Sequence, residues 1–203
     1  MRFRLALLGV IPGMMLLAGC SDTSSAEKKI PEPPPEAVTG RHAFQSTYGL
    51  ARTWSSDIQP LRIRSINLPN PKSEGGKAGA WEIVYVSESK GRSRAYTWSA
   101  VEAEGNLHKG VFAQGEESWS AHGSERPFPV AGIKFDTPEV LETAIGKSAT
   151  YMKNPKQKPQ VNFLLESTPR YPNPAWRVMW GESVSAAEWS VFVDATTGQY
   201  LGR

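Results

Sequence analysis

The sequence EWSVFVDATTGQYLG, residues 188–202, lies close to the C-terminus of this 203-residue chain. Its residues follow the order of a strand, a tight turn and a returning strand, so it predicts a β-hairpin. The turn chemistry is local: Asp194 can accept hydrogen bonds from backbone N–H groups two or three residues further on, and Gly198 can adopt a positive φ. We therefore expect Asp194, Thr197 and Gly198 to form a structural turn.

A less regular copy of this stretch, AYTWSAVEAEGNLHKG, occupies residues 95–110. Each copy is preceded by the same features: a helix, a strand, a proline-rich loop and a strand that begins with Ala-Trp. The Ala-Trp strands, AWEIVY at 80–85 and AWRVMW at 175–180, share the order small, aromatic, charged, branched, apolar, aromatic. This self-similarity predicts an internal repeat, in which Val101 stands where Asp194 stands in the second copy.

The spacing of apolar residues predicts two amphipathic helices. The first covers residues 42–58, and Pro60 stops it. The second begins with Thr137 as its N-cap and Pro138 at the first helical position, and it ends before Asn154. Its buried stripe is expected to consist of Val140, Leu141, Ala144, Ile145, Ala149 and Met152.

Alternating apolar residues predict strands in the rest of the chain. These strands are expected at residues 61–68, 80–86, 94–101, 160–166 and 175–181, followed by the terminal hairpin. The apolar phase changes between Ile63 and Ile66, which predicts a bulge. Residues 108–130 show no period and are expected to be largely a connector, while VAGIKF at 130–135 is expected to be a short strand.

These elements predict an α+β fold of two tandem units, residues 42–125 with the connector and residues 126–203. Each unit would pack one helix on an antiparallel sheet of three or four strands, because neither element can bury its apolar face alone. Units of about 80 residues are only marginally stable in isolation. We therefore expect the two units to pack against each other.

The N-terminal 20 residues have the features of a secretory signal: two early arginines and an apolar run too short to remain as a membrane-spanning helix. The run ends in Leu17, Ala18, Gly19 and Cys20, which resembles the lipobox of bacterial lipoproteins. The resemblance implies cleavage before Cys20 and attachment of acyl chains, such as palmitate, to its thiol. The alternative is an ordinary secretory signal with a cysteine placed there by chance.

Cys20 is the only cysteine, so an intrachain disulfide and a thiolate metal site are excluded. Each acyl methylene contributes about 0.8 kcal/mol to membrane binding, so two or three chains on Cys20 would hold the protein on a membrane. Residues 21–41 are rich in Ser, Pro and charge and predict a disordered tether. We expect a lipid-anchored, periplasm-facing protein of the cell envelope. If the bacterium is Gram-negative, Ser21 favours the outer membrane, because Asp is the residue that retains some lipoproteins at the inner membrane.

Composition argues against several classes of function. The formal net charge is +3, and removal of the two arginines in the signal would leave +1, so no basic stripe for nucleic acid is expected. His42, His108 and His122 are dispersed along the sequence, so neither a metal site nor a cofactor is predicted. No clustered nucleophile, base and acid appears, and we expect a protein that is not an enzyme.

The terminal sequence VDATTGQYL at 193–201 resembles the closing motif of PepSY and PepSY-like domains. The resemblance covers residues 137–203 well and residues 42–107 weakly, so the second copy is clear and the first is degenerate. It implies a cystatin-like helix-on-sheet unit in each copy. It also implies a non-catalytic binding or regulatory role, with restraint of a peptidase or another envelope enzyme as one form of that role.

An envelope protein is therefore the expected partner, and Trp119 in the connector is a possible contact for it. The other interpretation of Trp119 is that it pins the connector to the core. The alternative function is a small-ligand carrier or an enzyme with an aromatic pocket between the repeats.

Overall fold

The computed structural model describes residues 33–123, 125–153, 160–181 and 183–203. Residues 34–203 form one compact unit, which is the subject of this description. The predicted signal peptide, Cys20 and most of the predicted tether lie outside the described residues.

The first half of the compact unit contains one helix and most of the strands. Its elements are β1 (Val38–Thr39), α1 (Gly40–Trp54), β2 (Gln59–Ile66), β3 (Lys77–Ala78), β4 (Ala80–Ser87), β5 (Arg92–Ser99) and β6 (Gly110–Ser118). The second half follows with η1 (Val130–Gly132), α2 (Thr137–Lys147), α3 (Ala149–Met152), β7 (Val161–Glu166), β8 (Ala175–Gly181), β9 (Ala187–Asp194) and β10 (Tyr200–Gly202).

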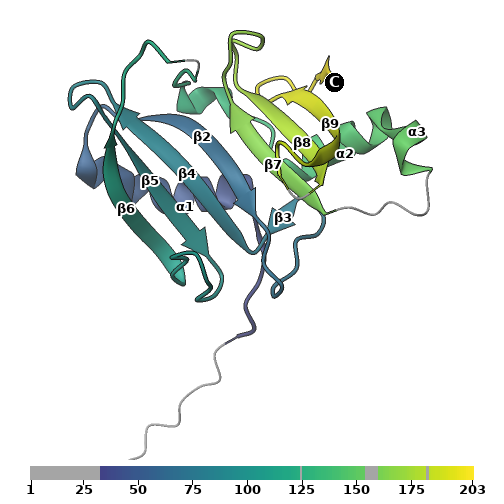
Figure 1. Cartoon of the computed structure of the whole chain (residues 1–203), viewed down its shortest axis with the longest axis horizontal. Coiled ribbons are helices and arrows are strands. Elements are labelled where there is room, and N and C mark those ends of the chain that lie inside the picture. Colours follow the sequence, from purple (N-terminus) through teal and green to yellow (C-terminus); the bar gives the residue numbers. More distant parts are fainter. Residues whose placement is uncertain (1–32, 124, 154–159, 182) are drawn as a thin grey trace, which may run out of the picture. The chain divides into compact units, whose positions relative to one another are not determined.

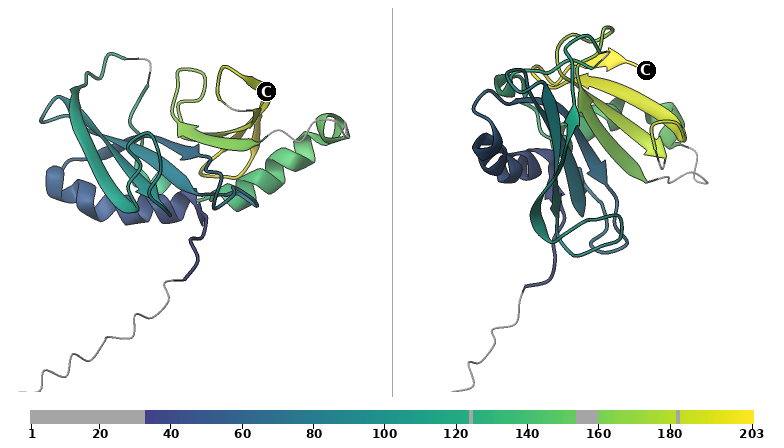
Figure 2. Two further views of the ribbon diagram at one scale, coloured as in Figure 1. Left: turned by 60° about the horizontal axis from the view of Figure 1, so that its bottom comes forward. Right: turned by 60° about the vertical axis from the view of Figure 1, so that its left-hand side comes forward.

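The fold is α+β, and its main element is one antiparallel sheet in the order β10-β9-β8-β7-β2-β4-β5-β6 (Figure 1). The two halves therefore share a continuous sheet, joined where β2 pairs with β7. Helix α1 packs on β4 and β5, and α2 packs on β8 and β9. Figure 2 shows both helices on the same side of this sheet, so its other side, the helix-free face, has no helix over it in the described residues.

The two halves repeat one order of elements, a helix followed by four strands of the sheet. The cross-strand pairing shows which residues of the two halves occupy equivalent positions. Ser65 pairs with Trp81 in the first half, and Leu165 pairs with Trp176 in the second. The preceding residues, Arg64 and Leu164, are thus equivalent, and they pair with each other across the junction. A local approximate two-fold axis passes between β2 and β7.

The core between helices and sheet has a pair of equivalent tryptophans. Trp81 and Trp176 are both fully buried. The indole N–H of Trp81 donates to the backbone oxygen of Val38 at 3.0 Å, and that of Trp176 donates to Phe135 at 3.1 Å. Each acceptor lies two residues before the helix of its own half. Both tryptophans therefore fix the entry to a helix.

The beginnings of the two helices contact each other. The backbone N–H of Gly40 donates to Thr137 Oγ1 at 3.1 Å, and that of Arg41 donates to Asp136 Oδ1 at 3.0 Å. Thr137 also donates to the backbone oxygen of Gly76. These bonds satisfy N–H groups that a helix start leaves free, and they connect the two halves.

The predicted N-cap of the second helix is wrong by one residue. Asp136 is the N-cap, and it forms a capping box in which its own N–H donates to Glu139 at 2.8 Å. Thr137 is buried and its hydroxyl bonds to the first half instead, so it does not cap its own helix.

Both helices end earlier than predicted. Helix α1 ends at Trp54, and α2 ends at Lys147, with Ser148 between it and the short α3. Ser148 is buried, and its hydroxyl accepts the indole N–H of Trp189 at 3.0 Å, which fixes the break. Because α3 follows this break, Ala149 and Met152 are exposed rather than part of the predicted buried stripe, and Ile145 at the end of α2 is exposed too.

Three strand predictions also need correction. Strand β6 lies inside the predicted connector. It is an edge strand in which no residue is fully buried, so its sequence does not alternate. The VAGIKF segment contains the 3-10 turn η1 rather than a strand. The irregular register lies between Pro60 and Arg62, not between Ile63 and Ile66, because proline cannot donate to the strand ladder.

Candidate functional site

Strand alternation determines which side chains reach the helix-free face. Ile63, Ile83 and Tyr96 belong to the core beneath the helices. Successive side chains point to opposite faces, so their neighbours Arg64 and Glu82, and likewise Thr97, point to the helix-free face.

One transverse row of this face crosses all eight strands, and we call it the central row. Cross-strand register gives its members in spatial order as Phe112, Thr97, Glu82, Arg64, Leu164, Arg177, Phe192 and Gly202.

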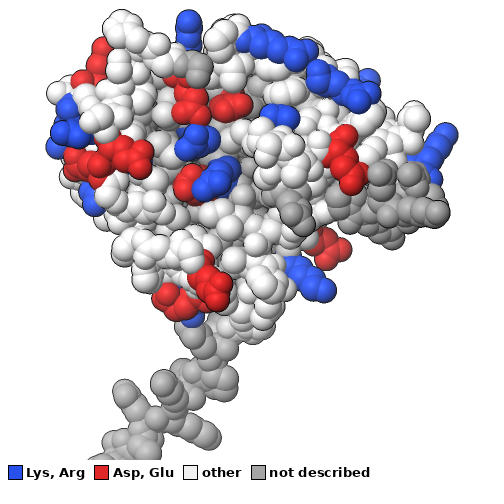
Figure 3. Space-filling view, viewed as in Figure 1, with Lys and Arg blue, Asp and Glu red and all other residues white. Residues whose placement is uncertain are grey.

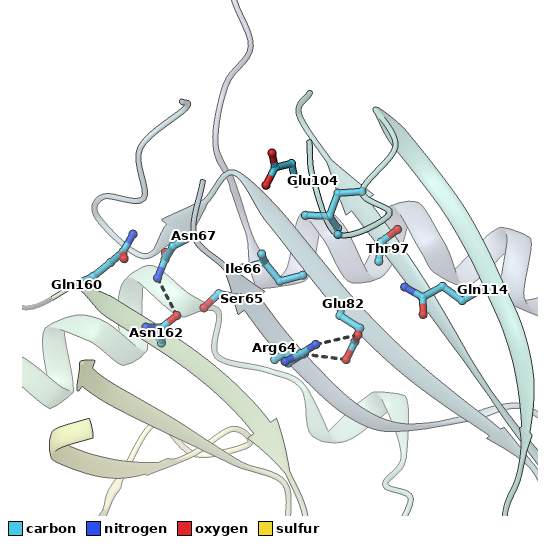
Figure 4. A pocket seen from close by; sticks show the side chains of 12 residues that line it. Arg64, Ser65, Ile66, Asn67, Glu82, Thr97, Glu104, Gln114, Gln160 and Asn162 are labelled. Atoms are coloured by element: carbon cyan, nitrogen blue, oxygen red, sulfur yellow. Dashed lines mark hydrogen bonds and ion pairs between the residues drawn. The ribbon is translucent and has the colours of Figure 1, made fainter. Parts of the chain in front are cut away.

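A polar hollow of about 530 Å³, here called the central groove, lies over the first-half part of the row. Figure 4 shows the ion pair of Arg64 with Glu82 in the middle, and Thr97 and Gln114 on one side of it. The ion pair is bidentate, with Arg64 Nε 2.8 Å and Nη2 3.0 Å from the two carboxylate oxygens of Glu82. This arrangement gives the groove one internally neutralised charge pair, several uncharged donors and acceptors, and the further carboxylate of Glu104.

The opposite side of the groove joins the two halves through amides. Asn67 Nδ2 donates to Asn162 Oδ1 at 2.7 Å, and Asn162 in turn donates to the backbone oxygen of Gly181 (Figure 4). Gln160 also lines this side. The groove therefore spans the junction between β2 and β7.

Two polar atoms of the groove lack a partner within the described protein atoms. Thr97 Oγ1 is buried without a hydrogen bond although the residue is only 1% exposed, and Asn67 Oδ1 is likewise buried without a donor. An unsatisfied buried polar group costs about 1–3 kcal/mol. Both atoms are buried beside the groove, and their hydrogen-bonding capacity is unused by the described protein atoms.

Two further hollows adjoin the central groove. One of about 460 Å³ shares Glu82 and Gln114 with it and reaches Trp119. The other, of about 400 Å³, shares Arg64 and Asn162 and reaches Leu164, Met179 and Val184, which gives it an apolar side. The helix-free face is thus hollowed along much of its width.

Trp119 follows the end of β6 and is half-buried. Its ring packs with Leu61, Val84 and Val86, and its backbone N–H donates to Gly91 at 3.1 Å. The structure therefore places Trp119 on the helix-free face, attached to the sheet, with part of its surface lining a hollow.

Glu166 is the carboxylate with the least favourable surroundings on this face. Burial raises its pKa, and the nearby Glu125 raises it further, while Arg177 and Arg62 act in the opposite direction. Arg62 is its cross-strand partner but forms an ion pair with Glu125 at 2.7 Å. Glu166 therefore lies between two arginines that it does not directly engage.

Asp57 belongs to a serine cluster and lines a small hollow with Val86 and Trp119. Its pKa is held well below the ordinary value by the hydroxyl of Ser55, then by the hydroxyl of Ser87 and the backbone N–H of Ser89. The three bonds measure 2.6, 2.6 and 2.9 Å. They connect the end of α1 to the turn between β4 and β5.

The histidines occupy separate places. His42 lies near the start of α1 against Trp98, His108 lies before β6 beside Glu102, and His122 lies in the loop after β6. Within the described ranges, no group of three His, Cys, Asp or Glu side chains is placed to hold a metal ion.

The terminal turn has the geometry of a side-chain-capped turn. Asp194 Oδ1 accepts the backbone N–H groups of Thr196 and Thr197, both at 2.8 Å, and Gly198 has a φ of 72°. A side chain at position 198 would meet the ring of Phe135 at 2.6 Å. Glycine is therefore required here for both conformation and space.

The first-half equivalent of Asp194 is Ser99, not Val101 as predicted. Ser99 pairs with Ala80 as Asp194 pairs with Ala175. Ser99 Oγ bonds within the turn to the backbone oxygen of Val101 at 2.6 Å, so a hydroxyl replaces the carboxylate. The prediction was wrong because the two turns differ in length, so the same number of residues before the turn glycine does not reach the same position in the two halves.

Leu17, Ala18, Gly19 and Cys20 lie outside the described residues. Among the helices that the structure describes, none combines the length and the apolar character needed to cross a bilayer.

No protein-family model and no curated protein matches this chain. Among solved structures, it is similar to a candidate lipoprotein from Clostridium difficile 630, with a TM-score of 0.51 and 10% sequence identity. The match covers 78% of this chain and 90% of the other. At this level of identity the likeness establishes a shared fold.

Proposed function

We propose that this chain is a lipid-anchored protein of the bacterial cell envelope that binds another protein on its helix-free face and does not catalyse a reaction. The observation that carries the proposal is the central groove, whose nearly buried Thr97 hydroxyl has no partner within the described protein atoms. A buried hydroxyl without a partner is unfavourable for folding. Its position beside an open groove is explained by a bound segment that satisfies it.

The anchor is supported by sequence and by fold. Leu17, Ala18, Gly19 and Cys20 have the order and position of a lipobox. The similar fold from Clostridium difficile 630 is itself described as a candidate lipoprotein. Acylated Cys20 would hold the compact unit on a membrane surface by residues 21–41. We expect the protein to face the periplasm, and if the bacterium is Gram-negative, Ser21 after the anchor favours the outer membrane over the inner membrane.

The lining of the groove favours a protein partner with an extended polar segment. Amide and hydroxyl side chains such as Asn67, Gln114 and Thr97 can pair with backbone N–H and C=O groups of a peptide. The Arg64–Glu82 pair leaves little net charge at the centre. The partner class that the PepSY resemblance implies is a peptidase or another envelope enzyme, restrained by this contact.

The repeated order of elements supports two tandem PepSY-like units. Each half has its helix, its fully buried tryptophan and its capped turn at equivalent places, as with Trp81 and Trp176. A groove at the junction of two such units uses side chains from both, for example Asn67 and Asn162. Neither unit alone would provide the complete surface.

The alternative of an aromatic pocket between the repeats has less support. Trp81 and Trp176 are fully buried, and both contact Phe163 with ring centroids 6.2 and 6.4 Å apart. These rings fill the space beneath the sheet with side chains. Because Arg64 and Glu82 already neutralise each other, the groove chemistry also favours binding over acid–base catalysis.

Site-specific photo-crosslinking in intact cells tests the proposal. A photoreactive amino acid replaces Gln114 on the groove or, as the matched control, Gln45 on the exposed side of α1. We expect a discrete cross-linked protein from position 114 and none from position 45. Equal products from both positions, or no product from position 114, would refute binding at the groove.

A further inference from the structure

We infer that Arg177 and Arg170 form a clamp for the carboxylates of an acidic peptide segment, on the second-half part of the helix-free face. The inference rests on the proposed function, because it assigns a second contact to the same protein partner. The clamp includes the ring of Phe192, which lies close to both arginines, and Tyr171, which packs on Phe192.

Glu82 is neutralised by a close ion pair, whereas Arg177 interacts with Glu166 without forming an ion pair in the described residues. Glu82 and Arg177 each follow the buried tryptophan of their own Ala-Trp strand, so they are equivalent positions of the central row. In the first half, Glu82 is paired with Arg64 across the strand. In the second half, the residue across from Arg177 is Leu164. Within the described residues, neither Arg177 nor Arg170 forms an ion pair with an acidic side chain.

Aromatic contacts hold the two guanidinium groups in place. The Cζ atom of Arg177 is 5.5 Å from the centre of the Phe192 ring, and that of Arg170 is 6.0 Å from it. Arg170 also lies 5.1 Å from the ring of Tyr171, which packs on Phe192 at 4.9 Å. These ring contacts restrict the arginine side chains, which reduces the side-chain entropy lost when they bind an anion.

Each guanidinium retains free N–H groups. Arg177 uses Nε and Nη2 to bond Ser190 Oγ at 3.3 and 3.2 Å, and Arg170 uses Nη2 to bond the main-chain oxygen of Arg203 at 3.2 Å. A guanidinium has five N–H donors, so each can still engage a carboxylate in the charge-assisted geometry that arginine favours.

Two neighbouring features keep this place open and polar. Tyr171 Oη is buried without a hydrogen-bond partner in the described protein. Gly202, across the sheet from Phe192, has no side chain, and a Cβ atom there would lie 3.4 Å from Tyr171 Oη and 3.9 Å from Arg170 Nη2. Any residue other than glycine would place its Cβ atom in this space, which is therefore open to an oxygen atom of a ligand.

The position of the clamp favours a protein segment over a membrane surface. Arg177 lies on the central row two strands from Arg64, which lines the groove, so one extended partner can contact both. Figure 3 shows Lys and Arg side chains gathered along the upper right of this face. Strand β1, where the chain enters the compact unit, lies at the opposite, lower end in Figure 1.

The test measures binding of a fluorescein-labelled hexaglutamate peptide to the full chain in detergent by fluorescence anisotropy. The double substitution Arg170→Gln and Arg177→Gln should weaken binding about tenfold or more, because it removes both bidentate donors. The matched control, Arg52→Gln with Arg92→Gln, makes the same change in net charge at exposed arginines elsewhere and should leave binding nearly unchanged. Arg177→Lys keeps the positive charge but loses the paired N–H donors of the guanidinium group. Its affinity for hexaglutamate should lie between those of the double variant and the control.

Several results would overturn the clamp: no binding of hexaglutamate by the unaltered chain, or an equal loss in the control variant. Binding to phosphatidylglycerol vesicles that depends on Arg170 and Arg177, without binding of hexaglutamate, would assign these residues to a membrane instead. If the double variant does not fold, Arg170→Gln alone, at an exposed side chain, serves in its place and should show a smaller loss. Cross-linking at Gln114 does not use these arginines, so failure of the clamp and failure of the groove are distinguishable.

Discussion

Arg177 occupies the position in the second half of the sheet that Glu82 occupies in the first, one residue after a fully buried tryptophan. The tryptophans face the core and make the same kind of hydrogen bond in each half. The residues that follow them face away from the helices and carry opposite charges. The two halves are therefore alike on the side that packs under the helices, while the helix-free face differs between them in charge.

Thr97→Val should stabilise the protein by about 1 kcal/mol, because it removes a buried hydroxyl that has no partner. The matched control is Thr47→Val. Thr47 is also fully buried, but its hydroxyl donates to Phe44 at 3.0 Å and contacts the Tyr85 hydroxyl at 2.9 Å, so its loss should cost about 1–3 kcal/mol. Urea unfolding measures both. Equal destabilisation by the two substitutions would show that Thr97 is satisfied in the folded protein.

Trp81→Phe and Trp176→Phe should each lower the free energy of unfolding by about 2 kcal/mol, because each removes ring volume from the core and leaves a backbone oxygen without its donor. Trp54→Phe, at a half-buried position, should cost distinctly less. Chemical denaturation of the three variants checks this ranking. A large effect of only one of the two buried tryptophans would contradict their equivalent roles.

Two glycines of α1 should respond to alanine in opposite directions. A Cβ atom on Gly40 would lie 2.9 Å from the buried ring of Trp176, so Gly40→Ala should destabilise by about 1–3 kcal/mol. Gly49 has open space around its Cβ position, and Gly49→Ala should stabilise the helix by about 0.5–1 kcal/mol. Thermal and urea unfolding measure both changes. A stabilising Gly40→Ala would mean that the two halves do not meet as closely as described.

Asp57 should contribute stability that depends on pH. Its folded-state pKa lies below the unfolded value, because Ser55, Ser87 and Ser89 donate hydrogen bonds to the carboxylate. A depressed pKa gives stability that is fully present above the unfolded pKa of about 4 and is lost as the pH falls below it. Asp57→Asn should therefore be less stable than the unaltered protein at neutral pH, and the difference should shrink in acid. A difference that is independent of pH would argue against this role of the carboxylate.

The parts of the fold that could be predicted from sequence are those in which burial imposes a period. The Ala-Trp strands were found because each has one face under a helix, with Trp81 and Trp176 as its largest residues. Strand β6 could not be predicted, because an edge strand without a fully buried residue has no such period. The prediction of Thr137 as the N-cap was wrong, because its hydroxyl bonds to the first half of the compact unit. Capping preferences describe only neighbours in the sequence, so they cannot predict such a contact.

The candidate site could not be predicted from sequence, because it exists only through register. Arg64, Thr97, Gln114 and Asn162 come from four different strands, and none is unusual in its own segment. Their proximity depends on the pairing of β2 with β7, which joins the two halves at Arg64 and Leu164.

The central claim is that the helix-free face holds a protein partner at the central groove. The most direct measurement is the cross-linking yield at position 114, relative to position 45, in cells with Thr97 and in cells with Thr97→Val. We predict one discrete product at position 114 whose yield falls when the hydroxyl is removed, although the variant is at least as stable. A yield that is unchanged by Thr97→Val, or that is equal at positions 114 and 45, would contradict the claim.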